Sequence, residues 1–277
     1  MRETQGSSME PPNEYDAFFR DFETPLMQEI RRQLYGEDNG LHSWGTMEEL
    51  QDDLHRLNIS PSSRIADLGC GPCGALASIL VAVGCKGTGI DRSASALVSG
   101  QSRAAALGVD DLMDVQRADL DEPLPFADKS FHAILAIDMI PHLRDRRSFF
   151  HEVVRLLIPG GRFLCIDPCV LTGSVSNHDL HQRLAWGFTQ LAPLGWNERL
   201  LEESGLRLME SQNRTIQVLH AAELEKKVYE AHRDQLERQF DWFEAERHQA
   251  YLEAAARLSR EQRMARIMYL AVREQDD

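Results

Sequence analysis

The chain has 277 residues, 43% of them hydrophobic and 27% charged, which favours one globular core domain with added helical segments. Its formal net charge of -14 argues against nucleic acid as a partner, because an acidic surface repels phosphate groups. No apolar run is long enough to cross a bilayer, the first residues lack a secretory signal core, and the five cysteines show no disulfide pattern, so we expect a cytoplasmic protein with no membrane partner.

Helical segments are predicted before residue 59. Residues 15–36 and 46–58 have helical patterns and are separated by the stretch EDNGLHSWG. Thr46, with Glu49 three positions later, has the spacing of a capping box and predicts where the second segment begins.

An alternation of short apolar runs with helical stretches begins at Arg64. Strands are expected at 64–69, 85–91, 112–119, 130–138, 160–168 and 206–215. Helices are expected at 74–83, 93–108, 146–157, near 176–190 and at 197–205. Strands that alternate with helices predict an α/β doubly wound sheet, in which right-handed crossovers join parallel strands.

Residues 218–258 contain neither glycine nor proline and are rich in Glu, Lys, Arg, Ala and Leu. Their apolar residues recur every three or four positions, which predicts a long helix or a pair of helices. A final strand is expected at 263–274.

The stretch IADLGCGPCG, residues 65–74, contains three overlapping motifs. Its glycines fit the dinucleotide pattern G-x-G-x-x-G, its cysteines fit C-x-x-C, and its aspartate with two glycines fits D-x-G-x-G. A structural metal site is not expected, because a four-thiolate site needs a second C-x-x-C, and Cys165 and Cys169 have the spacing C-x-x-x-C instead.

Asp67 distinguishes between the two nucleotide motifs. A pyrophosphate would be repelled by a carboxylate two residues before the first glycine, whereas the ammonium of S-adenosylmethionine would be attracted by it. Asp91 lies twenty residues after Gly71, at the end of a predicted strand, and suits the ribose of either ligand. Asp119 ends the next strand and could accept a hydrogen bond from adenine, although it could equally be a turn residue.

Four segments in order resemble the class I S-adenosylmethionine-dependent methyltransferases: IADLGCGPCG, GTGIDRS, ADLDEPLPFADKSFHAILAID and LLIPGGRFLCIDP. The resemblance implies a Rossmann-like sheet of seven strands with the last strand antiparallel. It also implies an N-terminal helical cap (1–58), a cofactor-binding core (59–217), a helical insertion (218–262) and a last strand with its tail (263–277).

The same resemblance implies S-adenosylmethionine as cofactor and S-adenosylhomocysteine as product, and no metal is expected. The implied cofactor contacts are Asp67, Gly69, Gly71, Gly74, Asp91, Arg92, Asp119, Leu120 and Ile137. One position departs from the family pattern, because Cys73 stands where the family has a third glycine.

The end of the fourth predicted strand reads AIDMIPHL and resembles phosphoethanolamine and sarcosine/dimethylglycine methyltransferases. That likeness implies that Asp138 and His142 orient a substrate amine and help to remove its proton, a step that a histidine near neutral pKa can perform. The alternative is that His142 caps or packs at the start of the next helix.

Aromatic residues near this site are candidates to line a substrate pocket. The N-terminal segment offers Tyr15, Tyr35 and Trp44, and the region after the fifth strand offers Trp186 and Trp196. Phe18, Phe19, His42 and Phe188 belong to the same groups, with packing as the alternative role for the two N-terminal phenylalanines.

Three functions remain open from the sequence. The first is methyl transfer to an amine nitrogen of a small molecule, and the second is O- or C-methylation of an aromatic or isoprenoid natural product. The third is a non-catalytic cofactor-binding partner subunit that uses the helical insertion as an interface. In each case the insertion is also a candidate homodimer face.

Overall fold

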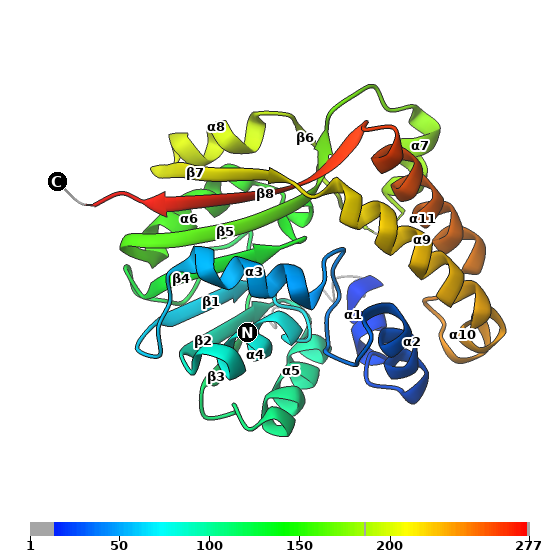
Figure 1. Cartoon of the computed structure of the whole chain (residues 1–277), viewed down its shortest axis with the longest axis horizontal. Coiled ribbons are helices and arrows are strands. Elements are labelled where there is room, and N and C mark those ends of the chain that lie inside the picture. The colour runs from blue at the N-terminus through cyan, green and yellow to red at the C-terminus, as the bar shows by residue number, and fades with distance from the viewer. Residues whose placement is uncertain (1–13, 186, 276–277) are drawn as a thin grey trace, which may run out of the picture.

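The computed structural model describes residues 14–185 and 187–275 (Figure 1). Its strands are β1 (Arg64–Leu68), β2 (Lys86–Asp91), β3 (Met113–Arg117), β4 (Phe131–Ile137), β5 (Leu157–Leu171), β6 (Ala192–Pro193), β7 (Leu206–Asn213) and β8 (Met264–Arg273). They form one sheet in the order β3-β2-β1-β4-β5-β8-β7, with β6 beside β5. The pairs among β1–β6 are parallel, and β8 is antiparallel to β5 and β7. The predicted α/β class and the antiparallel last strand are confirmed.

The sheet has one strand more than the seven that were predicted. β5 continues past its expected end at residue 168 to Leu171. Its last residues, Val170 and Leu171, pair with Ala192 and Pro193 on one side while β8 pairs on the other. The additional strand β6 is therefore a two-residue extension of an otherwise expected topology.

Helices cover both faces of the sheet. One face packs against α6 (Arg146–Leu156) and α8 (Trp196–Glu203), and the other packs against α3 (Met47–Leu57), α4 (Gly74–Val83) and α5 (Ala94–Leu107). Successive side chains of each strand point to opposite faces of the sheet, as the two-residue repeat of a strand requires. Ala66 and Leu68 point to the first face, while Ile65 points to the second.

Residues 15–36 form two helices, α1 (Glu14–Arg20) and α2 (Pro25–Tyr35), where the sequence suggested one helical stretch. Pro25 has no amide hydrogen to donate and is suited to the first turn of a helix, so the chain breaks before it and α2 begins there. The predicted start of α3 is confirmed, because the Thr46 side chain accepts a hydrogen bond from the Glu49 amide at 3.2 Å.

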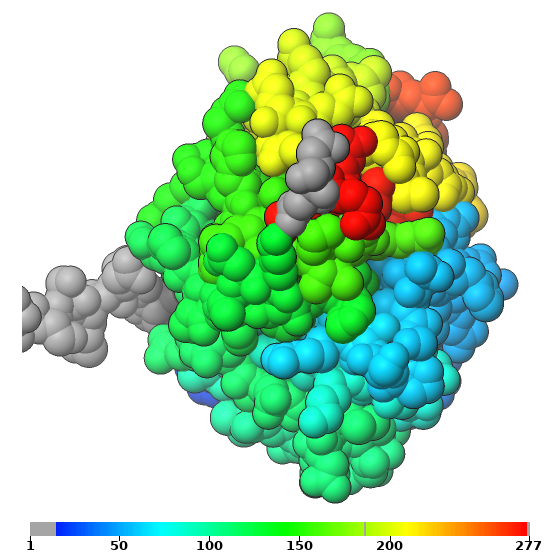
Figure 2. Space-filling model, turned by 90° about the vertical axis from the view of Figure 1, so that its left-hand side faces the viewer, coloured from blue at the N-terminus to red at the C-terminus, as the bar shows by residue number. Residues whose placement is uncertain are grey.

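The stretch predicted as a long helix or a pair folds as α9 (Thr215–Ala231) and α11 (Ala245–Arg260), joined through α10 (Arg233–Gln239). Apolar residues of α1 and α2 share a buried cluster with residues 228–245 of this hairpin. Figure 1 shows the blue N-terminal helices beside the orange α10 and α11, beyond the carboxyl ends of the parallel strands. Figure 2 shows the opposite end of the molecule, where core segments form the surface and the blue helices are almost hidden.

Candidate functional site

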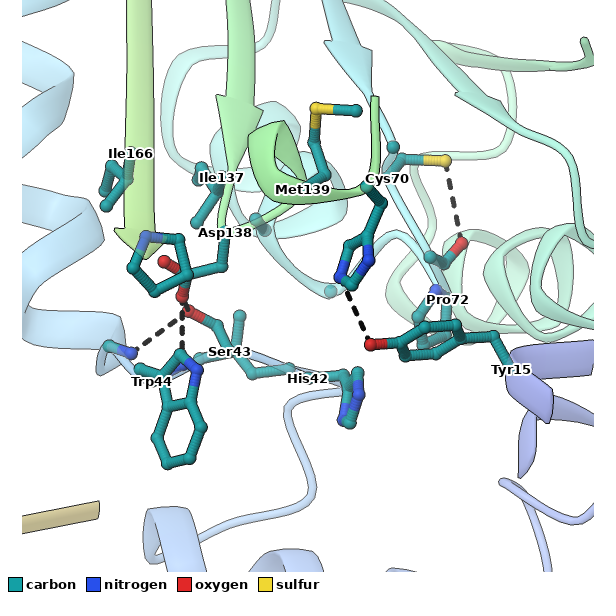
Figure 3. A pocket seen from close by; sticks show the side chains of 18 of the residues that line it. Tyr15, His42, Ser43, Trp44, Cys70, Pro72, Ile137, Asp138, Met139 and Ile166 are labelled. Atoms are coloured by element: carbon teal, nitrogen blue, oxygen red, sulfur yellow. Dashed lines mark hydrogen bonds between the residues drawn. The ribbon is translucent and has the colours of Figure 1, made fainter. Parts of the chain in front are cut away.

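A cavity of about 300 Å³ lies where the carboxyl ends of the parallel strands meet the N-terminal helices and the α9–α11 hairpin. Open α/β sheets bind ligands at this edge, where loops and helix N-termini converge. Figure 3 shows Tyr15 and Asp138 on different sides of this cavity, one from α1 and the other directly after β4.

The glycine loop between β1 and α4 forms one wall. Gly69 and Gly71 have φ values of 76° and 50°, a region that suits glycine because it has no Cβ. The Asp91 carboxylate accepts hydrogen bonds from the Gly71 amide at 2.9 Å and the Ser93 amide at 2.8 Å. Asp91 therefore holds the loop in its turn, in addition to facing the cavity.

Cys73, which stands where the methyltransferase pattern that the loop resembles has a glycine, adopts the left-handed conformation with a φ of 56°. Its side chain is fully buried, and two glycines make room for it. A Cβ at Gly100 would lie 2.6 Å from the Cys73 sulfur, and a Cβ at Gly89 would lie 2.9 Å from it. The departure from the family pattern is thus accommodated by missing side chains on α5 and β2.

Gly74 begins α4 and is required for a different reason. A Cβ on it would lie 2.4 Å from the carbonyl oxygen of Gly40, in the loop between α2 and α3. The backbone of that loop crosses the start of α4 at this point, so the glycine allows the N-terminal segment to close over the site.

Asp67, near the end of β1, is buried with 3% of its surface exposed and lines the cavity. Within the described residues, its carboxylate has no hydrogen-bond donor and no cationic partner. Burial, with a smaller contribution from Asp91, raises the pKa of Asp67 to about 7. A buried carboxylate without a partner fits a ligand that brings a cation, which supports the sequence-based argument for an ammonium at this position.

Every predicted cofactor contact lines this one cavity: Asp67, Gly69, Gly71, Gly74, Asp91, Arg92, Asp119, Leu120 and Ile137. Asp119 is exposed at its rim, and its carboxylate accepts a hydrogen bond from the Asp121 amide at 3.0 Å. The turn role considered for Asp119 is therefore present. Its place in the cavity wall keeps the adenine contact as a prediction.

Asp138 has a different environment from the one expected of an amine-binding base. Its carboxylate accepts hydrogen bonds from Arg266 at 2.8 Å, from the Ser43 hydroxyl at 2.7 Å and from the Trp44 amide at 3.0 Å. Both carboxylate oxygens thus have donors from the chain itself, since Arg266 binds Oδ1 and the bonds from Ser43 and Trp44, dashed in Figure 3, end on Oδ2. In this structure Asp138 holds the N-terminal segment against the core rather than presenting an open carboxylate to a substrate.

His142 faces the cavity with both ring nitrogens engaged. Nδ1 lies 2.9 Å from the Phe188 carbonyl oxygen, which can only accept, so Nδ1 carries the proton and Nε2 is unprotonated. Nε2 lies 3.1 Å from the Tyr15 hydroxyl, which then donates to it. Burial lowers the pKa of His142 below its ordinary value. The following helix is capped by Asp145, so His142 is not that cap.

Three of the five proposed substrate-lining aromatics, Tyr15, Tyr35 and Trp44, line the cavity. The prediction for Trp196 is not supported, because this residue starts α8 and packs with the hydrophobic core beneath the sheet, where Arg146 lies 5.4 Å from its ring. Trp186 lies outside the described residues.

Of the secondary aromatic candidates, Phe18, Phe19 and His42 line the cavity and also pack on one another. Burial lowers the pKa of His42 to about 4, so its ring is neutral at pH 7. Phe188 has an exposed side chain and reaches the site only through its backbone carbonyl.

Several cavity residues were not predicted, and they come mainly from α7 (Asn177–Arg183) and the hairpin. They are Arg183, Glu225, Tyr229, His248, Tyr251 and Arg266. The glycine-free stretch signalled an insertion but not its docking over the site, because that placement depends on long-range packing against α1 and α2.

The described residues contain no helix long and apolar enough to cross a membrane. Within the same ranges, no group of three or more His, Cys, Asp and Glu side chains is arranged to hold a metal ion.

Part of this site lies in a segment of the chain that matches a known protein family. Residues 66–165 match a family model described as "Methyltransferase domain". Residues 66–165 of this chain thus carry the pattern of a methyltransferase domain. The matched residues contain the glycine loop, Asp91, Asp119, Asp138 and His142.

Curated proteins named as methyltransferases are similar to part of this chain. Methyltransferase GfsG of Streptomyces halstedii is 31% identical over 170 residues, which cover 59% of this chain and 60% of that protein. Phosphoethanolamine N-methyltransferase 1 of Zea mays is 26% identical over 71% of this chain and 38% of that protein. The chain therefore spans less than two thirds of the length of these relatives. Other relatives are named as C-24- and O-methyltransferases.

Solved structures extend the likeness of fold to nearly the whole chain. Phosphoethanolamine N-methyltransferase 2 of Haemonchus contortus, in complex with phosphomonomethylethanolamine and S-adenosylhomocysteine, has a TM-score of 0.78 at 20% identity, covering 96% of this chain and 61% of that one. The [4+2]-cyclase SpnF has a TM-score of 0.74 at 16% identity, covering 98% and 100%. A fold shared with a protein named as a cyclase does not by itself choose a reaction.

Proposed function

We propose that this protein is an S-adenosylmethionine-dependent methyltransferase acting on a small molecule, and that the acceptor atom is an amine nitrogen. The observation that carries the cofactor assignment is Asp67, a buried carboxylate beside the glycine loop with no partner among the described residues. An isolated buried charge is costly, and a ligand ammonium would offset that cost.

The described residues fit this cofactor. Asp67 would hold its ammonium, Asp91 its ribose hydroxyls and Asp119 its adenine amino group. When bound, the cofactor supplies an activated methyl group on a sulfonium. The Asp91 carboxylate already holds the Gly71 amide, so ribose binding would add to an existing contact that shapes the loop.

The amine assignment rests on Tyr15 and His142. An amine exposes its lone pair only after losing a proton, and neutral Nε2 of His142 can accept that proton directly, through Tyr15 or through water. The Phe188 carbonyl fixes the tautomer that leaves Nε2 able to accept. Closure of α1 over the site brings Tyr15 to the histidine and helps to exclude water from the reaction.

O- or C-methylation of an aromatic or isoprenoid natural product is the second candidate. It is favoured by the aromatic lining from Phe19, Tyr35, Trp44 and Tyr229, which suits a flat or apolar acceptor. The third candidate is a non-catalytic cofactor-binding subunit, which the intact glycine loop disfavours.

The first test is calorimetric titration of the protein with S-adenosylhomocysteine. Saturable binding supports the cofactor assignment, and its absence at high micromolar concentration would remove the basis of the proposal. The second test is transfer of labelled methyl from S-adenosylmethionine into pooled metabolites, with product masses identifying N-, O- or C-methylation.

We further propose that residues 1–58 and 218–262 act as a cap over a core of residues 59–217 and 263–277, and that the protein is cytoplasmic. A homodimer through the insertion would use the outer side of α9, where Ile216 and Leu224 are exposed. Sedimentation equilibrium tests the dimer, and a monomer at high micromolar concentration would exclude it.

A further inference from the structure

Five arginines are buried in the described part of the chain, and four of them have carboxylate partners. Arg31 pairs with Asp38, Arg146 with Asp167, Arg214 with Asp53, and Arg266 with Asp138 and Glu49. Arg183 is the exception. Although only 5% of its surface is exposed, no carboxylate of residues 14–185 or 187–275 lies within 4.0 Å of its guanidinium.

Arg183 ends α7 and lines the cavity. Its Nη1 donates a hydrogen bond to the Tyr251 hydroxyl at 3.0 Å. Its guanidinium carbon lies 4.9 Å from the centre of the Tyr251 ring and 5.6 Å from that of Trp44. The two aromatic rings thus hold the guanidinium at the cavity wall, and Tyr251 gives it a neutral partner rather than a counter-ion.

A guanidinium remains charged at all pH values relevant to a folded protein. Placing it in a cavity without a carboxylate is costly, and contacts with aromatic faces offset only part of that cost. The same chain neutralises each of its other buried arginines with a carboxylate. A counter-ion supplied by a ligand explains the exception most directly.

We propose that Arg183 and Tyr251 form a subsite for an anionic group of the methyl acceptor, a carboxylate or a phosphate. This inference rests on the proposed function, because it assigns the subsite to the substrate of that reaction. A planar fork of N–H donors is suited to both oxyanions, which can accept two hydrogen bonds side by side. The acceptor is therefore a small molecule with a negative charge at some distance from its methylated atom.

The position of the subsite separates it from the cofactor contacts. Asp67 lies near the end of β1, Asp91 ends β2 and Asp119 follows β3, all on one side of β4 in the strand order. Arg183 follows β5, beyond β4 in the strand order, and Tyr251 comes from α11. His142, which follows β4, lies between the two groups in this order, as expected for a residue at the junction of cofactor and acceptor.

The test uses the whole protein saturated with S-adenosylhomocysteine and titrated calorimetrically with inorganic phosphate and, separately, with acetate. Wild-type protein is expected to bind one of them saturably with a Kd of about 1 mM, and Arg183→Met to bind it about 10- to 100-fold more weakly. Preference for phosphate or acetate identifies the anionic group. Arg260→Met is the matched control, because Arg260 is exposed on α11 and pairs with Glu223.

Arg183→Lys and Tyr251→Phe refine the assignment. Lysine keeps the charge but lacks the planar fork of N–H donors. Arg183→Lys is therefore expected to bind the anion more weakly than wild type and more tightly than Arg183→Met. Loss of the Tyr251 hydroxyl is expected to weaken binding several-fold. Circular dichroism and melting temperature establish that each variant is folded, and Arg183→Lys remains informative if the methionine variant does not fold.

Three results would overturn the proposal. They are an absence of anion binding by wild type, equal binding by wild type and Arg183→Met, and a tenfold loss of S-adenosylhomocysteine affinity in Arg183→Met. The last result would assign Arg183 to the carboxylate of the cofactor. Failure of S-adenosylhomocysteine to bind wild type would instead reject the proposed function, and titration of the unliganded protein would still test the anion subsite.

Discussion

The Tyr15 hydroxyl lies 3.1 Å from Nε2 of His142, although the two residues are 127 positions apart in the chain. Tyr15 belongs to α1 and His142 follows β4, so the contact exists only when the N-terminal segment is closed over the sheet. The docking of α1 over the sheet therefore also supplies the hydrogen-bond partner of His142.

His142→Ala is expected to slow methyl transfer by about 100- to 10,000-fold with little change in S-adenosylhomocysteine affinity, because its proposed task is proton removal. Tyr15→Phe removes the hydroxyl but keeps the ring packing and should slow transfer less. Single-turnover kinetics combined with calorimetry separates the two quantities. A His142→Ala variant with normal turnover and weakened cofactor binding would contradict the assigned role.

Cofactor affinity is expected to depend on pH through Asp67, whose pKa is raised to about 7 by burial in the unliganded protein. Below pH 7 this carboxyl is mostly protonated and must lose a proton before it can pair with an ammonium. Affinity for S-adenosylhomocysteine should therefore rise by up to about tenfold per pH unit from pH 5.5 to 7 and then level off. Calorimetry across this range measures the slope, and Asp67→Asn should bind weakly with no such slope.

The raised pKa of Asp67 also predicts that ionisation of this carboxyl lowers the free energy of unfolding as the pH rises, whereas it increases the affinity for the cofactor. The pKa of Asp67 in the folded protein, about 7, lies above the ordinary value of 3.8, so burial favours the protonated form. The cost of ionising the buried carboxyl is absent below pH 3.8, grows as the pH rises and is complete above pH 7. Asp67→Asn should thus raise the free energy of unfolding at pH 8 by about 2 to 4 kcal/mol. Urea denaturation at pH 5 and 8 measures it, and an equal gain at both values would contradict this cause.

Sequence patterns predicted the core of this fold, and they predicted that the proposed cofactor contacts would share one edge of the sheet, because both depend on local signals. Strand-length apolar runs set the sheet, and the residues after them, such as Asp67 and Asp91, reach one edge by the geometry of parallel strands. Contacts between distant segments were not predictable in this way. The pairing of Asp138 with Arg266 and the approach of Tyr251 to Arg183 depend on how the N-terminal helices and the hairpin dock.

Trp196 illustrates why position along the chain is an insufficient guide. It follows the fifth strand, where the resemblance favours a substrate lid, but it begins an amphipathic helix whose apolar side covers the sheet. Arg183, thirteen positions earlier, reaches the cavity instead. Helix amphipathicity considered together with the strand order would have distinguished Trp196, which packs in the core, from Arg183, which lines the cavity.

Cys73 and Gly100 provide a double-mutant test of how the chain accommodates its departure from the family pattern. In wild type, Gly100→Ala places a methyl group 2.6 Å from the Cys73 sulfur and should destabilise the protein by about 1 to 3 kcal/mol. In a Cys73→Gly background that contact is absent, so the same substitution should be neutral or stabilising by up to about 1 kcal/mol, as expected when alanine replaces glycine inside a helix. Urea denaturation of the four proteins gives the coupling energy between the two positions. Gly173→Ala serves as a control, because its added Cβ would meet other atoms only at 3.4 Å or more. Additive effects within about 0.5 kcal/mol would show that Gly100 does not compensate for the Cys73 side chain.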